Sequence, residues 1–143
     1  FDLPPAGRSG VAMVFLPQDA GLRRQAEAAV ESATRAEGLR HIGWRDVPVN
    51  PLAAGWLARE VMPVIRQYFV AAPESIDGSS FERKLFVTRK QIKNRVIGLS
   101  RSSPAAGWDD FYICSFSSRT VVYKGLLVAD LLYGWLDPRI SYR

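Results

Sequence analysis

Val11-Ala12-Met13-Val14-Phe15-Leu16-Pro17 contains the first apolar run of the chain, and Gly10 precedes it. A short, partly β-branched run between a glycine and a proline predicts a buried strand. From residue 19 the apolar side chains change from the period of a strand to that of a helix. A buried strand followed closely by an amphipathic helix indicates layers of helix and sheet packed on one another.

Residues 19–37 predict the helix, because their apolar residues recur at i, i+4, i+7, i+8 and i+11 and so share one face. These residues are Leu22, Ala26, Ala29, Val30 and Ala33. Asp19 is the expected N-cap and Gly38 the expected stop after the last turn. The exposed face carries charges of both signs, which is typical of a solvated helix exterior.

Residues 39–49 predict a second strand, and Pro48 should lie at its end or at a sheet edge because proline cannot donate to a strand ladder. A helical apolar pattern returns over residues 52–69, interrupted by Pro63. Since proline lacks the N–H and clashes with the preceding turn, we expect a kink there, or two short helices.

Residues 81–88 predict a third strand, which leads into a basic segment that ends near Ser100. Residues 111–116 and 120–124 predict two strands joined by a three-residue link, which is the pattern of a hairpin. Residues 128–136 are strongly apolar and predict a short helix. The expected order is β-α-β-α-β-α-β-β-α, which favours an α+β fold with a mixed, partly antiparallel sheet.

The composition is that of an ordinary globular protein, with 143 residues, 48% of them hydrophobic, and a formal net charge of +5. This length suits one domain with its own core. No apolar stretch reaches the length of a transmembrane helix. The single cysteine excludes an internal disulfide framework and predicts a reducing, cytoplasmic setting.

Candidate chemical groups are few. His41 is the only histidine, Cys114 the only thiol, and Asp109-Asp110 the only adjacent carboxylates, which fit an Asx-type turn at a loop end. This ligand set is too small for a transition-metal site. Cys114 lies in a predicted strand and is expected to be a buried hydrophobe rather than a nucleophile. The two glycine motifs that bind phosphate groups, G-x-x-x-x-G-K-[ST] and G-x-G-x-x-G, do not occur in the sequence.

The segment 82–101 is the one charge feature above background, with a single acid among seven basic residues: Arg83, Lys84, Arg89, Lys90, Lys93, Arg95 and Arg101. One interpretation is a face for nucleic acid or another anionic partner. The other is a solvated helix exterior or a docking surface for an acidic neighbour. Aromatic residues are not interleaved with these charges, which argues against nucleic acid.

Two longer runs carry a family resemblance. The first begins Gly43-Trp44-Arg45-Asp46-Val47-Pro48-Val49 and continues to Val70, and the second combines Phe81-Glu82-Arg83-Lys84-Leu85 with the run from Phe111 to Leu127. Ser117-Ser118-Arg119-Thr120-Val121-Val122-Tyr123-Lys124-Gly125 is the most specific part. Together with residues 11–17, these runs resemble the class II glutamine amidotransferase domain of the glutamate synthase large subunit.

The resemblance implies an N-terminal-nucleophile hydrolase fold, in which two sheets are stacked between helical layers. It implies a glutaminase domain that releases ammonia from glutamine for glutamate synthesis from 2-oxoglutarate. In that family an N-terminal cysteine is the nucleophile and its α-amino group is the base, and FMN and an iron–sulfur cluster belong to the full enzyme. The electron donor of such an enzyme is not specified by this chain.

The chain departs from this family pattern at its functional positions. Residue 1 is Phe where the family has Cys, and the family's arginine motif and Asn-Gly pair do not occur. No catalytic, cofactor-binding or metal-binding residue is therefore transferred to this chain, and Arg119 and Lys124 are expected to make structural contacts. Whether the chain is an enzyme is left open by its sequence.

Two hypotheses follow. In the first, residues 1–143 are the central part of one amidotransferase domain, inactive alone, with the remainder of the enzyme as partner. Missing strands would then leave apolar surface exposed, which predicts self-association. In the alternative, the chain is a non-catalytic binding module whose basic face, residues 83–101, takes an anionic partner.

Overall fold

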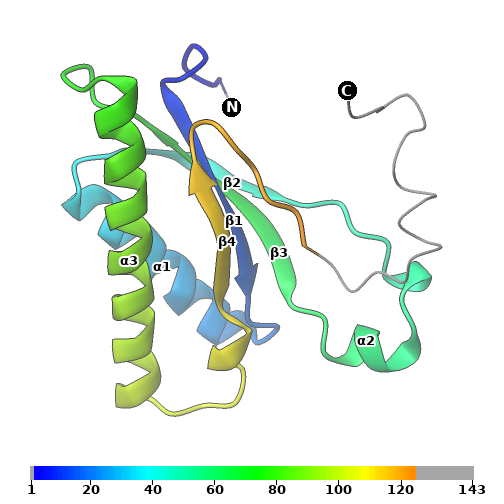
Figure 1. Ribbon diagram of the computed structural model, residues 1–143. Coiled ribbons are helices and arrows are strands. Elements are labelled where there is room, and N and C mark those ends of the chain that lie inside the picture. The colour runs from blue at the N-terminus through cyan, green and yellow to red at the C-terminus, as the bar shows by residue number, and fades with distance from the viewer. Residues whose placement is uncertain (1, 125–143) are drawn as a thin grey trace. The chain divides into compact units, whose positions relative to one another are not determined.

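The computed structural model describes residues 2–124, which divide into two units. The first unit consists of residues 2–48 and 63–123, and the second of residues 49–62 with Lys124. The first unit holds a sheet of β1 (Ser9–Leu16), β2 (Arg40–Asp46), β3 (Val64–Ala71) and β4 (Tyr112–Ser117) in the order β2-β3-β1-β4 (Figure 1). All three pairings are antiparallel, so the predicted mixed sheet is wrong for the described strands.

Two long helices, α1 (Ala20–Ala36) and α3 (Gly78–Ser102), lie on the same face of this sheet (Figure 1). The core lies between them and the strands. It contains the inward side chains Ala12, Val14, Leu16, Tyr68, Val70 and Phe116 of the sheet, Leu22, Ala26 and Val30 of α1, and Phe81, Leu85 and Ile92 of α3. A short 3-10 turn, η2 (Trp108–Asp110), precedes β4 and adds Trp108 to the core.

The first strand and helix are confirmed. β1 covers the predicted run, and α1 begins where Asp19 accepts a hydrogen bond from the Leu22 amide at 2.8 Å. Gly38 has a φ of 71°, in the left-handed region that a glycine adopts without strain, and it ends the helix. β2 ends at Asp46 and is an edge strand, which leaves Pro48 beyond the ladder as expected.

The helical prediction for residues 52–69 is wrong. The described residues of the second unit form the 3-10 turn η1 (Pro51–Ala53) and the short helix α2 (Trp56–Glu60), and no other helix or strand. After Pro63 the chain becomes the strand β3, whose last five residues are all buried. Val64-Ile65 and Tyr68-Phe69-Val70 are β-branched and aromatic, which favours a strand. Tyr68 and Val70 pack in the core with α1 and α3, and Phe69 lies on the other face beside Val121 and Tyr123. Apolar residues on both faces matched a helical period by coincidence.

The strand predicted at residues 81–88 is also wrong, because this segment is the first half of α3. Asp77 caps the helix by accepting a hydrogen bond from the Ser80 amide at 2.6 Å. The buried residues Phe81, Leu85, Thr88, Ile92 and Val96 recur at spacings of three and four, which is the period of a helix. Residues 81–88 alone are too short to reveal that period, whereas the whole of residues 81–96 shows it.

The predicted hairpin is wrong in its second half. β4 matches the first strand, but residues 118–124 contain no strand. They leave β4 in a turn and run as an extended segment (Figure 1). The helix predicted at 128–136 lies outside the described residues. None of the described helices is both long and apolar enough to cross a membrane.

Candidate functional site

The sheet face opposite α1 and α3 carries a hollow. It measures about 440 Å³ and is lined by Leu3, Val11, Arg45, Gln67, Phe69, Val121 and Tyr123. Its floor comes from three adjacent strands, because Val11 pairs with Phe69 and Arg45 pairs with Gln67 in the sheet register. The extended segment after β4 supplies Val121 and Tyr123. We call this surface the open face.

A short polar chain crosses the open face. An Arg45 guanidinium nitrogen donates to Oε1 of Gln67, and Nε2 of Gln67 donates to the Tyr123 hydroxyl at 3.4 Å. The Arg45 guanidinium also lies 5.8 Å from the centre of the Phe69 ring. Gln67 is only 3% exposed, so its amide depends on these partners. We call Arg45, Gln67 and Tyr123 the polar seam, which is a hydrogen-bond network with one fixed positive charge and no nucleophile.

Glu82 of α3 holds the turn through which the chain passes from β4 to the open face. Its carboxylate accepts from the Ser118 amide at 2.5 Å, from the Ser118 hydroxyl at 2.5 Å, and from the Ser117 hydroxyl at 3.0 and 3.1 Å. Partial burial acts to raise the pKa of Glu82, but the bonds from Ser118 and Ser117 and the charge of Arg119 outweigh it and hold that pKa below its usual value.

We call the contacts of Glu82 with Ser117 and Ser118 the Glu82 anchor. Ser117 also binds the residues that follow this turn. Its hydroxyl oxygen accepts from the amides of Arg119 and Thr120 at 3.0 and 3.2 Å, and the Ser115 hydroxyl oxygen accepts from the Val122 amide at 3.1 Å. The Ser117-Ser118-Arg119-Thr120 sequence is thus a capped turn that directs the next residues away from β4. The anchor explains why the predicted hairpin does not form, since these amides are bonded to side chains and not to a partner strand.

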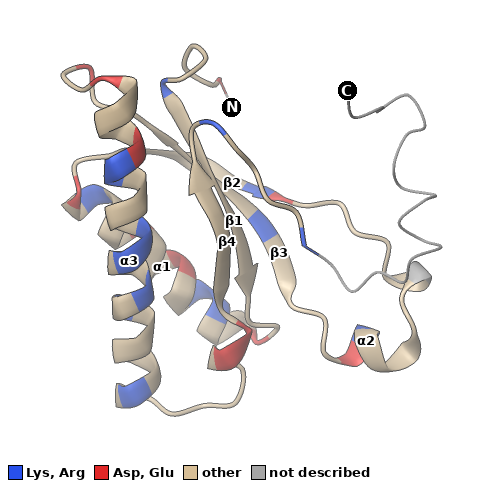
Figure 2. Ribbon diagram, in the orientation of Figure 1, with Lys and Arg blue, Asp and Glu red and all other residues tan. Residues whose placement is uncertain are grey.

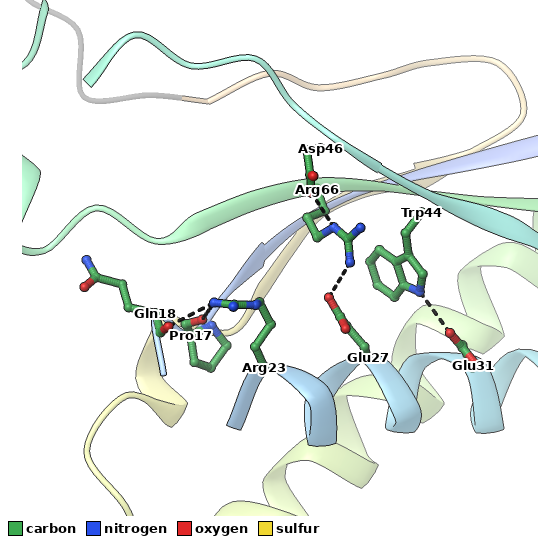
Figure 3. Close-up of polar contacts among 8 residues, drawn as sticks. All are labelled: Pro17, Gln18, Arg23, Glu27, Glu31, Trp44, Asp46 and Arg66. Carbon is green, nitrogen blue, oxygen red and sulfur yellow. Dashed lines mark hydrogen bonds and ion pairs between the residues drawn. The ribbon is translucent and has the colours of Figure 1, made fainter. Parts of the chain in front are cut away.

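A charged cluster lies where β2 and β3 meet α1 (Figure 3). Arg66 donates to Glu27 at 2.6 Å, and its Nε lies 2.7 Å from a carboxylate oxygen of Asp46. The Trp44 indole donates to Glu31 at 3.0 Å, and Arg66 lies 5.4 Å from the Trp44 ring centre. Because every charge in this cluster has a partner, it fixes α1 against the sheet and has the character of a structural contact.

The two candidate reactive residues lie apart from one another and from the seam. Cys114 is 7% exposed and is the extra residue where the β1–β4 register shifts. His41 of β2 faces the Tyr68 hydroxyl at 3.2 Å, and burial raises the pKa of Tyr68 to about 12. Asp109 and Asp110 lie in η2. Among residues 2–124, no three His, Cys, Asp or Glu side chains are grouped to hold a metal ion.

The basic segment divides into two sets. Lys84 donates to the Glu37 carbonyl at 2.7 Å, Arg89 to the Ile113 carbonyl at 2.7 Å, and Arg95 to the Ser32 hydroxyl at 3.1 Å. These three side chains tie α3 to α1 and β4, so they do not belong to a binding face. Arg83, Lys90, Lys93 and Arg101 are exposed on the helix.

The first unit is a mixed α/β structure, with an antiparallel sheet covered by helices on one face, an architecture consistent with the class II amidotransferases. The profile of the family described as "Glutamine amidotransferases class-II" matches residues 1–137. The chain therefore belongs to the class II glutamine amidotransferase family, and the expected family is confirmed.

Its relatives include several glutamate synthases. The chain is 42% identical over 133 residues to a chloroplastic ferredoxin-dependent glutamate synthase of Oryza sativa subsp. japonica, covering 91% of this chain and 8% of that protein. It is 41% identical over 130 residues to the large chain of the NADPH glutamate synthase of Bacillus subtilis (strain 168), covering 90% and 8%. The corresponding large chain of Azospirillum brasilense is 33% identical over 129 residues, with the same shares. The chain thus spans about 8% of the length of these relatives.

Sequence reasoning missed the residues that organise the site. One feature of the sequence could have drawn attention to Glu82, because it is the single acid within a basic segment. Its partners Ser117 and Ser118 lie 35 and 36 residues further along the chain. Arg45 and Gln67 fall within the first run of the family resemblance, but that run does not reveal that they pair, since their register depends on where β3 begins.

Proposed function

We propose that residues 1–143 form the central part of one amidotransferase domain within a longer protein. In that protein the domain releases ammonia from glutamine, and the ammonia is used to make glutamate from 2-oxoglutarate. Family membership over residues 1–137 is the observation that carries this proposal. The glutamate synthase relatives, of which the chain spans about 8%, support it. The alternative of a free-standing basic binding module has no such support.

In this proposal the chain contributes scaffold and no catalytic group. Hydrolysis of an amide by covalent catalysis requires an accessible nucleophile with an activating base. Cys114 is buried in the sheet, and His41 is bonded to Tyr68 on β3 rather than placed beside a thiol. The polar seam of Arg45, Gln67 and Tyr123 can hold and orient groups by hydrogen bonds, but it cannot attack a carbonyl.

The open face supports the finer part of the fold, a sandwich of two stacked sheets. Val11, Phe15 and Ile65 are apolar and only half-buried on that face, whereas the opposite face is closed by α1 and α3. A second sheet would cover these side chains at the usual spacing of about 10 Å between packed sheets. Without it we expect the isolated chain to self-associate through this face.

FMN and an iron–sulfur cluster belong to this proposal only through the longer protein. An iron–sulfur cluster is held by several cysteine thiolates, and this chain has a single cysteine, which is buried. The residues present therefore do not fit the cluster. The cytoplasmic setting predicted from the single cysteine is likewise part of the proposal.

A glutaminase assay on two proteins tests the function. The longer protein should release ammonia and glutamate from glutamine, whereas the 143-residue chain should release neither. Cys114→Ser should leave the activity of the longer protein unchanged, because the proposal assigns this thiol no chemical role. Turnover by the chain alone, abolished by Cys114→Ser, would overturn it.

A further inference from the structure

The outward face of α3 combines basic and apolar side chains in one stripe. It consists of Arg83, Phe86, Lys90, Lys93, Ile97 and Arg101, which recur at spacings of three and four on the side opposite the buried residues of the helix. Phe86 is 58% exposed and Ile97 38% exposed. We call these six residues the α3 stripe. Figure 2 shows basic residues repeated along this helix.

The α3 stripe itself contains four basic residues and no acid, and among the described residues the N-cap Asp77 interacts electrostatically with only one of them, Arg83. Glu82, the single acid between residues 82 and 101, is bonded to Ser117 and Ser118. The ammonium of Lys90 lies 5.3 Å from the centre of the Phe86 ring, so the charge and the apolar surface are in contact. Like charges three and four residues apart destabilise a helix slightly, so the pattern costs stability in the isolated unit.

Helix α1 provides a comparison within the same molecule. The two acids of α1, Glu27 and Glu31, contact Arg66 and Trp44 of the sheet, and Arg35 lies 3.6 Å from Glu31 as an i, i+4 pair. Each acid of α1 thus has a partner within the first unit. The α3 stripe lacks this pairing and adds an exposed aromatic ring. The two helices lie side by side on the same sheet (Figure 1), so the difference is specific to the outward face of α3.

We propose that the α3 stripe docks an acidic amphipathic segment from the remainder of the longer polypeptide. This inference rests on the proposed function, since the occupant is another part of the same protein. Apolar residues of the segment would cover Phe86 and Ile97, and its carboxylates would face Lys90 and Lys93. A protein segment fits better than nucleic acid, because Phe86 is the only aromatic ring in the stripe and stacking needs successive rings.

The length of the relatives supports a partner in the same chain. This chain spans about 8% of them, so in a protein of that length most of the polypeptide lies outside residues 1–143 and can supply the acidic segment. Charge complementarity selects among those parts, because a basic segment opposite the α3 stripe would be repelled.

Chemical labelling of lysines in the longer protein tests the inference. Lys90 and Lys93 should be acetylated at least about fivefold more slowly in the longer protein than in the 143-residue chain, a factor that roughly 1 kcal/mol of docking produces. Lys84, which is bonded to Glu37 in both, is the internal control. A zero-length carbodiimide should couple Lys90 or Lys93 to an Asp or Glu outside residues 1–143. Phe86→Ser should restore the fast labelling without unfolding α3, because Phe86 is outside the core.

Equal labelling of Lys90 and Lys93 in the two proteins would overturn the inference, and so would couplings confined to a second copy of residues 1–143. Protection that appears only when single-stranded nucleic acid is added would overturn it in favour of that ligand. Glutaminase activity of the longer protein is measured on the same samples. Active protein with unprotected lysines defeats only the docking inference, whereas protected lysines without glutaminase activity defeat the proposed function.

Discussion

The two faces of the sheet are built from alternate residues of the same strands, yet they differ in kind. On the helix-covered face, Ala12, Val14 and Tyr68 have no exposed surface and belong to one apolar core. On the open face, the neighbouring Gln67 is part of a polar seam beside a hollow of about 440 Å³. Alternation along a strand sends successive side chains to opposite faces, so the sequence specifies both at once.

The difference between the two faces shows which side of the sheet is covered by helices of the described residues. The helix-covered face is closed by α1 and α3, with the charged cluster of Figure 3 at its margin. Within residues 2–124, the open face is crossed by the segment after β4, which Glu82 anchors, and Leu3 also borders its hollow. A face that combines half-buried apolar residues with fixed hydrogen-bond partners is suited to a further layer of protein.

The largest expected difference in stability is between truncation of Phe81 of α3, which packs on the helix-covered face, and truncation of Phe69 of β3 on the open face. Phe81→Ala should lower the free energy of unfolding by about 3–5 kcal/mol, because Phe81 is fully buried under the sheet. Phe69→Ala should cost roughly half as much, since Phe69 borders the hollow and its site can be filled by water or by Val121. Urea denaturation measures both.

Equal losses for the two alanine variants would contradict the contrast and would mean that the open face is as tightly packed as the core. Phe81→Leu keeps the measurement possible if Phe81→Ala does not fold, because it removes less volume from the same site.

Gly10 tests how closely α3 approaches the sheet. A Cβ at this position would lie 2.8 and 2.9 Å from the two Cδ atoms of Leu85 and 3.3 Å from the Phe81 ring. Gly10→Ala should therefore destabilise by about 1–3 kcal/mol through overpacking. Combined with Leu85→Ala it should cost less than the sum of the two single changes, because the cavity accepts the new methyl.

Gly98→Ala is the matched control for Gly10→Ala. Gly98 lies in α3 and nothing approaches its Cβ position within 4 Å, so alanine should stabilise the helix by up to about 1 kcal/mol. Thermal unfolding compares the variants. A neutral Gly10→Ala would show that the helix can move away from the sheet.

Glu82→Gln should loosen the segment that crosses the open face. The amide keeps the shape of the side chain but loses the charge that strengthens its bonds to Ser117 and Ser118, which should cost about 1 kcal/mol at neutral pH because the carboxylate is partly exposed. Amide hydrogen exchange at Ser118 should become faster, whereas exchange in the core of α1 should change little.

The pH dependence of this effect has a fixed sign. Because the pKa of Glu82 is lowered on folding, its contribution is complete above the pKa of an unfolded glutamate, about 4.3, and is lost as the pH falls through the folded value. The stability difference between the wild type and Glu82→Gln should therefore shrink below about pH 4. A difference that stays constant down to pH 3 would show that the carboxylate charge has no part in the anchor.

Local sequence predicted the elements that form by local rules. β1, α1 and its Asp19 cap, and the position of Pro48 beyond β2 all follow from period, capping and proline geometry. The family was also identified from sequence runs, independently of whether each element was assigned correctly.

Elements decided by distant contacts could not be predicted in this way. Residues 64–71 carry apolar side chains on both faces because β3 lies in the centre of the sheet, between the core and the segment after β4, and this position cannot be recognised from residues 64–71 alone. The course of residues 118–124 depends on Glu82, which lies on another element. The open-face seam depends on the register that pairs Arg45 with Gln67. In each of these three cases, contacts between distant residues override the preference of the local sequence.

The smallest expected effect is at the polar margin of the closed face. Tyr68→Phe removes the hydroxyl that faces His41 at 3.2 Å, and near neutral pH it should cost no more than about 1 kcal/mol, because the half-buried His41 ring can bond water instead. Alkaline pH should separate the two proteins. Burial raises the pKa of Tyr68 to about 12, so the folded state favours the neutral phenol and its contribution is lost between about pH 10, the unfolded pKa, and pH 12.

Unfolding free energies measured from pH 9 to 12 should therefore fall more steeply for the wild type than for Tyr68→Phe, which has no phenol at this position. Parallel curves would mean that water reaches the Tyr68 hydroxyl and that the helix-covered face is open at its β2 margin. In that case the two faces would differ in degree of burial only, because the closed face would then also depend on a further layer of protein at its edge.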